Sequence, residues 1–150
     1  MTGAYIYESI RSPRTKAKES GGLHELTPSE LLAQLYETLA RRQNLDPSVV
    51  SEIILGCVTQ YGEQAANIAK TSSLLARWPA TIAGMTLNRF CSSSIDAIAL
   101  AALKVAAGHS SAVLAGGVEM MSRVPLMADL ARDSPDPLYR ASTHISLLAA

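Results

Sequence analysis

The sequence is poor in cysteine, in net charge and in long hydrophobic runs, and each shortage excludes a class of protein. Lys and Arg total 13 and Asp and Glu total 13 among 150 residues, so the formal net charge is zero. A neutral chain has no strong electrostatic attraction to nucleic acid or to an anionic membrane. Its two cysteines, Cys57 and Cys91, cannot by themselves make a disulfide framework or a four-ligand zinc site. We therefore expect no nucleic-acid partner, no membrane partner and no metal.

Segments typical of protein targeting are also missing. The first residues, MTGAYIYES, do not combine a charged n-region with a long apolar stretch. No run reaches the roughly 20 apolar residues that cross a bilayer. We therefore expect reduced thiols and a cytoplasmic location. The hydrophobic share of 48% is enough to build the core of one domain.

Short apolar runs alternate along the chain with segments of helical periodicity. The apolar runs predict strands at 5–7, 53–58, 82–87 and 112–115, the last closed by Gly116-Gly117, and the periodic segments predict helices at 28–42, 67–77 and 92–107. The first helix has a capping box, formed by Thr27 and Glu30, with Pro28 at its first position. The run at 53–58 lacks polar alternation, as in a strand covered on both faces. The alternation predicts an α/β fold with a parallel or mixed sheet covered by helices.

Cys91 lies between the strand predicted at 82–87 and the helix that follows it. The carboxyl edge of such a sheet is where ligands usually bind. A helix N-terminus favours the thiolate form of a nearby thiol, and its unpaired N–H groups can hold a developing oxyanion. The segment 95–107 is apolar on nearly all sides, so we expect a helix that lies inside a larger body and a thiol that faces a cleft. Two interpretations remain open from these features, a nucleophilic cysteine and a structural one.

The segment Leu87–Ser94, LNRFCSSS, resembles the acyl-enzyme signature of the thiolases. Three further blocks agree with that family in order and spacing: Arg11–Pro13, Gly56–Gly62 with Asn67–Lys70, and Ala115–Pro125. By resemblance, Cys91 is the nucleophile that takes up the acyl group as a thioester, and its backbone N–H helps to form an oxyanion hole. The resemblance implies coenzyme A and acyl-CoA as substrates, no covalently bound cofactor, and a homo-oligomer, either a dimer or a tetramer.

The resemblance also implies a fold and a reaction. The fold is the N-terminal half of a duplicated five-layer α/β architecture, with residues 1–118 as the core that carries the nucleophile elbow. Residues 119–150 are then the start of a loop excursion. The reaction is reversible Claisen chemistry, which either transfers an acyl group to acetyl-CoA or cleaves 3-oxoacyl-CoA. The residues that contact coenzyme A remain unassigned.

Parts of the family pattern are missing from this chain. Thiolases are more than twice as long, and their Gly-His-Pro, Asn-Glu-Ala and second-cysteine motifs have no counterpart here. Gly108-His109 is followed by Ser110 and is expected to end a helix. We expect His24 and His144 to be surface or packing residues, and the segment 144–150 departs from the family pattern. The 150 residues alone are therefore expected to be inactive as a complete thiolase, with acyl transfer lowered by orders of magnitude.

The role of Glu119 and the choice among three functions remain open at this stage. Cys57 is interpreted as structural, whereas Glu119 either supports the site or caps a loop. A β-ketoacyl synthase is the alternative enzyme, since Cys-Ser-Ser-Ser also occurs around the nucleophile of that family. A catalytically silent fragment or assembly unit is the alternative that is not an enzyme.

Overall fold

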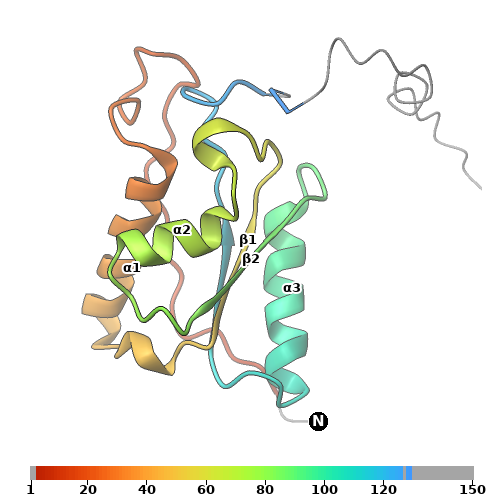
Figure 1. Cartoon of the computed structure of the whole chain (residues 1–150). Helices are drawn as coiled ribbons and strands as arrows, with labels where there is room; N and C mark the ends of the chain where they lie inside the picture. Colours follow the sequence, from red (N-terminus) through yellow and green to blue (C-terminus); the bar gives the residue numbers. More distant parts are fainter. Residues whose placement is uncertain (1–2, 127, 130–150) are drawn as a thin grey trace, which may run out of the picture.

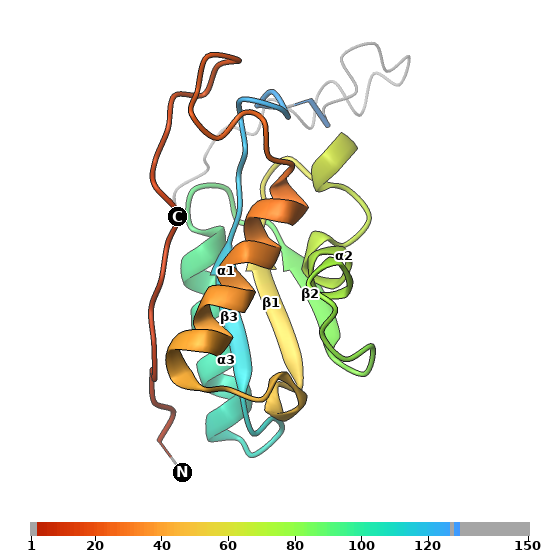
Figure 2. The same cartoon turned by 90° about the vertical axis from the view of Figure 1, so that its left-hand side faces the viewer.

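The computed structural model describes residues 3–126 and 128–129 and shows a three-stranded sheet between two layers of helices (Figure 1). Strands β1 (Glu52–Gly56), β2 (Ala83–Leu87) and β3 (Val113–Gly117) are parallel and lie in the order β2-β1-β3. Figures 1 and 2 show α1 (Pro28–Gln43) and α2 (Ile68–Leu75) on one face and α3 (Ser93–Ala106) on the other. Two short 3₁₀ helices, η1 (Pro47–Val49) and η2 (Gly62–Gln64), lie in the connections. The predicted α/β fold with a parallel sheet is confirmed.

The central strand explains why the sequence has a continuous apolar run. All five residues of β1 are buried. Ile53 and Leu55 pack in the core formed with α1 and α2, while Ile54 packs against Ala97 and Ala101 of α3. Successive side chains of a strand point to opposite faces, so a strand with helices on both faces needs apolar residues at every position.

The predicted start of α1 is confirmed in detail. The Glu30 backbone N–H donates to Thr27 Oγ1 at 3.2 Å, and the Thr27 backbone N–H donates to Glu30 Oε2 at 2.7 Å. The helix is fixed to α2 by its buried Tyr36, whose hydroxyl lies 3.0 Å from Ser72 Oγ. Burial raises the pKa of Tyr36 to about 12, so its hydroxyl stays neutral and available for this hydrogen bond.

The predicted strand at 5–7 is wrong. Residues 5–7 have no strand conformation, and the side chains of Tyr5, Ile6 and Tyr7 are 77%, 81% and 88% exposed. A high β-propensity favours a strand only where a neighbouring strand and a packed face are available. The predicted end of the last strand at residue 115 is also wrong, because the pairing of β3 with β1 continues through Gly117.

In the part of the chain that the structure describes, α3 is covered on one face only, and its expected burial inside a larger body stays a prediction. The sheet covers only the face of α3 that carries Ala97 and Ala101. On the other faces Ile95 and Leu103 are 67% and 68% exposed. The apolar composition of α3 predicts burial, but composition alone does not show which faces of the helix the described residues cover. None of the helices in the described residues contains an apolar stretch of the length that spans a bilayer.

Candidate active site

Cys91 lies in a tight turn that joins β2 to α3. Strand β2 ends at Leu87 and α3 begins at Ser93, with Ser92 as its N-cap residue. Cys91 is exposed, its thiol has no hydrogen-bond partner within the described residues, and its backbone forms an isolated β-bridge with Arg89. The residue before it, Phe90, has a φ of 51°, in the left-handed region that a non-glycine residue rarely occupies. The turn therefore presents a free thiol on a strained backbone.

Ser93 closes this turn from the helix side. Its hydroxyl donates to the Phe90 carbonyl at 2.6 Å and accepts from the Arg89 backbone N–H at 2.8 Å. The Ser93 backbone N–H also donates to the Phe90 carbonyl, at 3.0 Å. Because Ser93 is buried against the sheet, these three hydrogen bonds hold the turn close to the end of β2.

Asn88 holds the turn from the strand side. Its Nδ2 donates to the Val58 carbonyl at 3.0 Å, and its Oδ1 accepts from the Phe90 backbone N–H at 2.8 Å. Arg89 adds a third restraint, because one guanidinium nitrogen lies 2.7 Å and 2.9 Å from the two carboxylate oxygens of Asp96 on α3. The turn that carries Cys91 is thus tied both to the loop after β1 and to the helix.

Two glycines at the ends of neighbouring strands let α3 approach the sheet. Gly56 ends β1, and a Cβ there would overlap the backbone of Ser93 and Ser94. Gly117 ends β3 beside Gly56, and a Cβ there would overlap the Ser94 hydroxyl. Only a residue without a side chain fits between the strand ends and the start of this helix. The close approach of α3 to these two glycines was not predicted, although a glycine near the end of each apolar run was the available signal.

Glu119 connects the loops that follow β1 and β3. Its Oε2 accepts from the backbone N–H groups of Val58 at 2.8 Å and Thr59 at 3.3 Å, and its Oε1 accepts from Gln64 Nε2 at 3.1 Å. The fully buried Gln64 also accepts from the Met120 backbone N–H at 2.6 Å. These contacts show Glu119 capping a loop that Asn88 also binds, and its support of the site stays a prediction.

Arg123 anchors the segment beyond Glu119. Its guanidinium binds both carboxylate oxygens of Glu63 at 2.5 Å and 2.6 Å and donates to the His24 carbonyl at 2.7 Å. The hydrogen bonds from Arg123 hold the pKa of Glu63 below its ordinary value. Arg123 thus joins the segment after β3 both to η2 and to the loop that precedes α1.

Cys57 has the environment of a structural cysteine. It lies one residue beyond the end of β1, rather than inside the strand, and is 1% exposed. Burial, with a smaller contribution from the charge of Glu119, raises the pKa of Cys57 to about 12. A thiol this buried and this weakly acidic is a poor nucleophile. The two cysteines are therefore in opposite environments.

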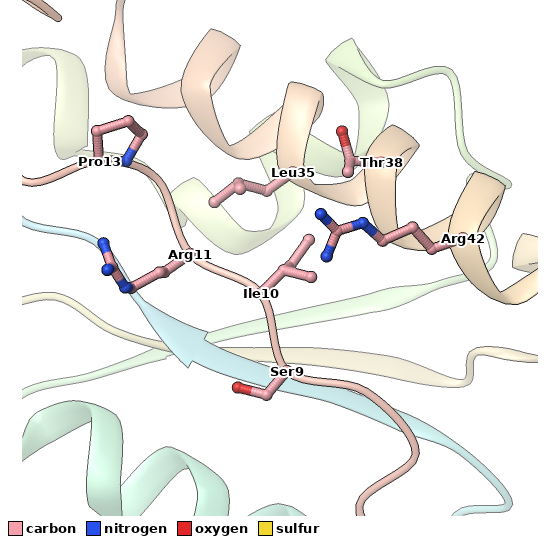
Figure 3. A pocket seen from close by; sticks show the side chains of 7 residues that line it. All are labelled: Ser9, Ile10, Arg11, Pro13, Leu35, Thr38 and Arg42. Carbon is pink, nitrogen blue, oxygen red and sulfur yellow. The ribbon is translucent and has the colours of Figure 1, made fainter.

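Neither of two hollows in the described part of the chain is lined by Cys91, so the cleft expected around this residue stays a prediction. A hollow of about 440 Å³ lies beside the turn and is lined by Asn88, Arg89 and the exposed face of α3, but not by Cys91. A second hollow, of about 580 Å³, lies between α1 and the extended segment 9–13 (Figure 3). The guanidinium of Arg11 points away from that of Arg42 there, so the two charges do not converge on one ligand.

Neither His24 nor His109, the two histidines in the described residues, hydrogen-bonds to Cys91. His109 follows Gly108, whose φ of 72° ends α3, and so lies at the far end of a helix about 20 Å long. The expected position of His109 at the helix C-terminus is confirmed. The Nδ1 atom of His24 is buried without a partner, and its carbonyl binds Arg123. His144 lies outside the described residues, as does most of the proposed excursion at 119–150.

An exposed cysteine in a turn between a parallel strand and a helix is compatible with a class of α/β proteins, and comparison with known proteins identifies the family. The family described as "Thiolase, N-terminal domain" matches residues 5–144, so this chain belongs to the thiolase family. This match decides in favour of the thiolases over the β-ketoacyl synthases.

Named relatives support the same assignment. The chain is 39% identical over 128 residues to the 3-oxoadipyl-CoA/3-oxo-5,6-dehydrosuberyl-CoA thiolase of Escherichia coli K12. These aligned residues cover 85% of this chain and 31% of that protein. The chain is 37% identical over 126 residues to a steroid 3-ketoacyl-CoA thiolase of Mycobacterium tuberculosis, covering 84% and 30%. The crystal structure of the Bacillus anthracis acetyl-CoA acetyltransferase matches with a TM-score of 0.65 and 41% identity, over 70% of this chain and 26% of that one. The chain thus spans about a third of the length of the curated relatives it matches.

Proposed function

We propose that Cys91 is the nucleophile of a thiolase-type acyl transfer and receives an acyl group from an acyl-CoA thioester. The observation that carries the proposal is the state of Cys91, an exposed thiol without a hydrogen-bond partner, on a restrained turn at the start of α3. Membership of the thiolase family supports this role, because the turn contains the segment that resembles the family's acyl-enzyme signature.

The proposed first step is an exchange between a thiol and a thioester. Cys91 Sγ attacks the carbonyl carbon, the bond from that carbon to the sulfur of coenzyme A breaks, and the proton of Cys91 ends on the departing sulfur. The backbone N–H of Cys91, beside the start of α3, would donate to the carbonyl oxygen as negative charge develops there. An acyl-cysteine keeps the carbonyl carbon electrophilic, so the exchange stays reversible.

The second step is carbon–carbon bond formation or cleavage, and we assign it to the full thiolase reaction. It needs an acid and a base, and within the described residues no histidine hydrogen-bonds to Cys91. General acid–base assistance contributes about 10²–10⁴-fold to such reactions. We therefore expect these 150 residues to perform the first step slowly and the second step not at all. Coenzyme A thioesters as substrates and assembly into a homo-oligomer are part of the same proposal.

The test is acetylation of the protein by excess acetyl-CoA, read by peptide mass spectrometry. We expect one acetyl group on the peptide that contains Cys91, and none after Cys91→Ser. The Cys57→Ala variant is the matched control, since it removes the other thiol and should retain the acetyl group on Cys91. If wild type takes up no acetyl group, or takes it up on Cys57, the proposed role of Cys91 is wrong. The catalytically silent alternative then stands.

A further inference from the structure

The conformation of Phe90 needs an explanation, because it costs free energy and its own side chain does not account for it. A non-glycine residue in the left-handed region is strained and persists only where its surroundings hold it. The Phe90 side chain is 71% exposed, so packing of its ring does not fix the backbone. What holds the residue is hydrogen bonding at both ends, by Ser93 at its carbonyl and by Asn88 at its N–H.

Asn88 differs from Ser93 because its side chain also contacts a loop that is distant in the sequence. Ser93 belongs to the same turn and helix, whereas Asn88 also binds the Val58 carbonyl, 30 residues away in the sequence. Both backbone polar groups of Val58 are held by side chains, because its N–H donates to Glu119 Oε2. The Phe90 backbone is therefore connected through Asn88 and Val58 to Glu119, on the loop that follows β3.

We propose that Asn88 is a positioning residue for Cys91, which holds Phe90 in the left-handed conformation and so directs the next residue, Cys91, outward from the turn. Asn88 does not touch the reacting atoms; it acts through the backbone of Phe90. The proposal rests on the proposed function of Cys91, but the geometry it describes is measurable without any reaction. Sequence spacing does not reveal it, since the decisive contact joins the loops after β1 and β2.

The test compares Asn88→Ala with a variant that restores the turn by another route. Asn88→Ala removes both hydrogen bonds and should lower the rate of Cys91 acetylation by acetyl-CoA about tenfold, since strained Phe90 then leaves its conformation in most molecules. Adding Phe90→Gly should recover most of the loss, because glycine adopts positive φ without strain. If Asn88 contributed only to the overall stability of the fold, Phe90→Gly would not restore the acetylation rate.

Asn67→Ala is the matched control. Asn67 also has a positive φ and makes two comparable hydrogen bonds, from Nδ2 to the Gly84 carbonyl at 2.8 Å and from the Lys70 N–H to Oδ1 at 3.3 Å. It lies at the start of α2, so Asn67→Ala should lower the urea midpoint but leave the acetylation rate unchanged. Equal slowing by Asn67→Ala, or no recovery with Phe90→Gly, would overturn the proposal.

A second measurement separates this proposal from the function of Cys91. The φ of Phe90 can be read by NMR from the coupling between its amide and α protons. We expect a left-handed value in wild type and an extended or right-handed value in Asn88→Ala. If wild type is not acetylated but this shift occurs, the proposed function fails and the positioning role of Asn88 survives. If Phe90 keeps its conformation in Asn88→Ala, the positioning role is wrong whether or not Cys91 reacts.

Discussion

Replacing Gly56 with alanine tests whether close packing of α3 on the strand ends is what builds the turn. The added Cβ would lie 2.5 Å from the Ser94 backbone nitrogen and 2.7 Å from Ser93 Cβ, well inside normal contact distances. Neither neighbour is the end of a flexible side chain, so the start of the helix itself must move. Overpacking of this kind costs about 1–3 kcal/mol. The change should therefore both destabilise the fold and displace the turn that carries Cys91.

Gly116→Ala is the matched control for Gly56→Ala. Gly116 lies in β3, where it pairs with Leu55 of β1, and the next residue, Gly117, pairs with Gly56. Nothing lies within 4 Å of the Cβ that alanine would add at Gly116. Glycine inside a strand is itself unfavourable by about 0.5–1 kcal/mol relative to alanine. Gly116→Ala should therefore be neutral or stabilising, although the chemical change is identical.

Urea unfolding followed by the fluorescence of the buried Trp78 measures both variants. With an m-value of about 2 kcal/mol/M, a loss of about 2 kcal/mol lowers the midpoint by about 1 M. Gly56→Ala should show that decrease and Gly116→Ala should not. Equal midpoints for the two variants would refute the argument that α3 packs directly on Gly56.

Two further predictions concern the thiols and the acid stability. Limiting iodoacetamide should label exposed Cys91 well before Cys57, whose burial and raised pKa of about 12 suppress its reaction, and the preference should disappear in denaturant; equal labelling of the folded protein would contradict the assigned environments. Arg123 lowers the pKa of Glu63 from its ordinary 4.5, so this pair stabilises the fold at neutral pH and loses its contribution as the pH falls below about 4.5. Glu63→Gln should cost less than about 1 kcal/mol at pH 7, because the pair is partly exposed, and should make the urea midpoint less sensitive to pH between 5 and 3. A wild-type acid dependence in Glu63→Gln would show that other carboxylates dominate.

Local patterns in the sequence determined most of the secondary structure. The capping box at Thr27 and Glu30, the glycine after α3 and the unbroken apolar run of β1 each act over a few residues, so they are visible in the sequence and confirmed in the fold. The same locality places Cys91 between β2 and α3, and the LNRFCSSS segment that carries the family resemblance is also local. Its role as nucleophile stays a prediction.

Only the tertiary structure showed the features that depend on contacts between residues distant in the sequence. The aromatic segment 5–7 has strand propensity but no pairing partner, and α3 has apolar faces that the sheet does not reach. Glu119 binds the loop after β1 across 61 residues, and Asn88 reaches the same loop across 30. A side chain's type shows which hydrogen bonds it can make, but only the parallel order of the strands brings their carboxyl ends, and hence these loops, together at one edge.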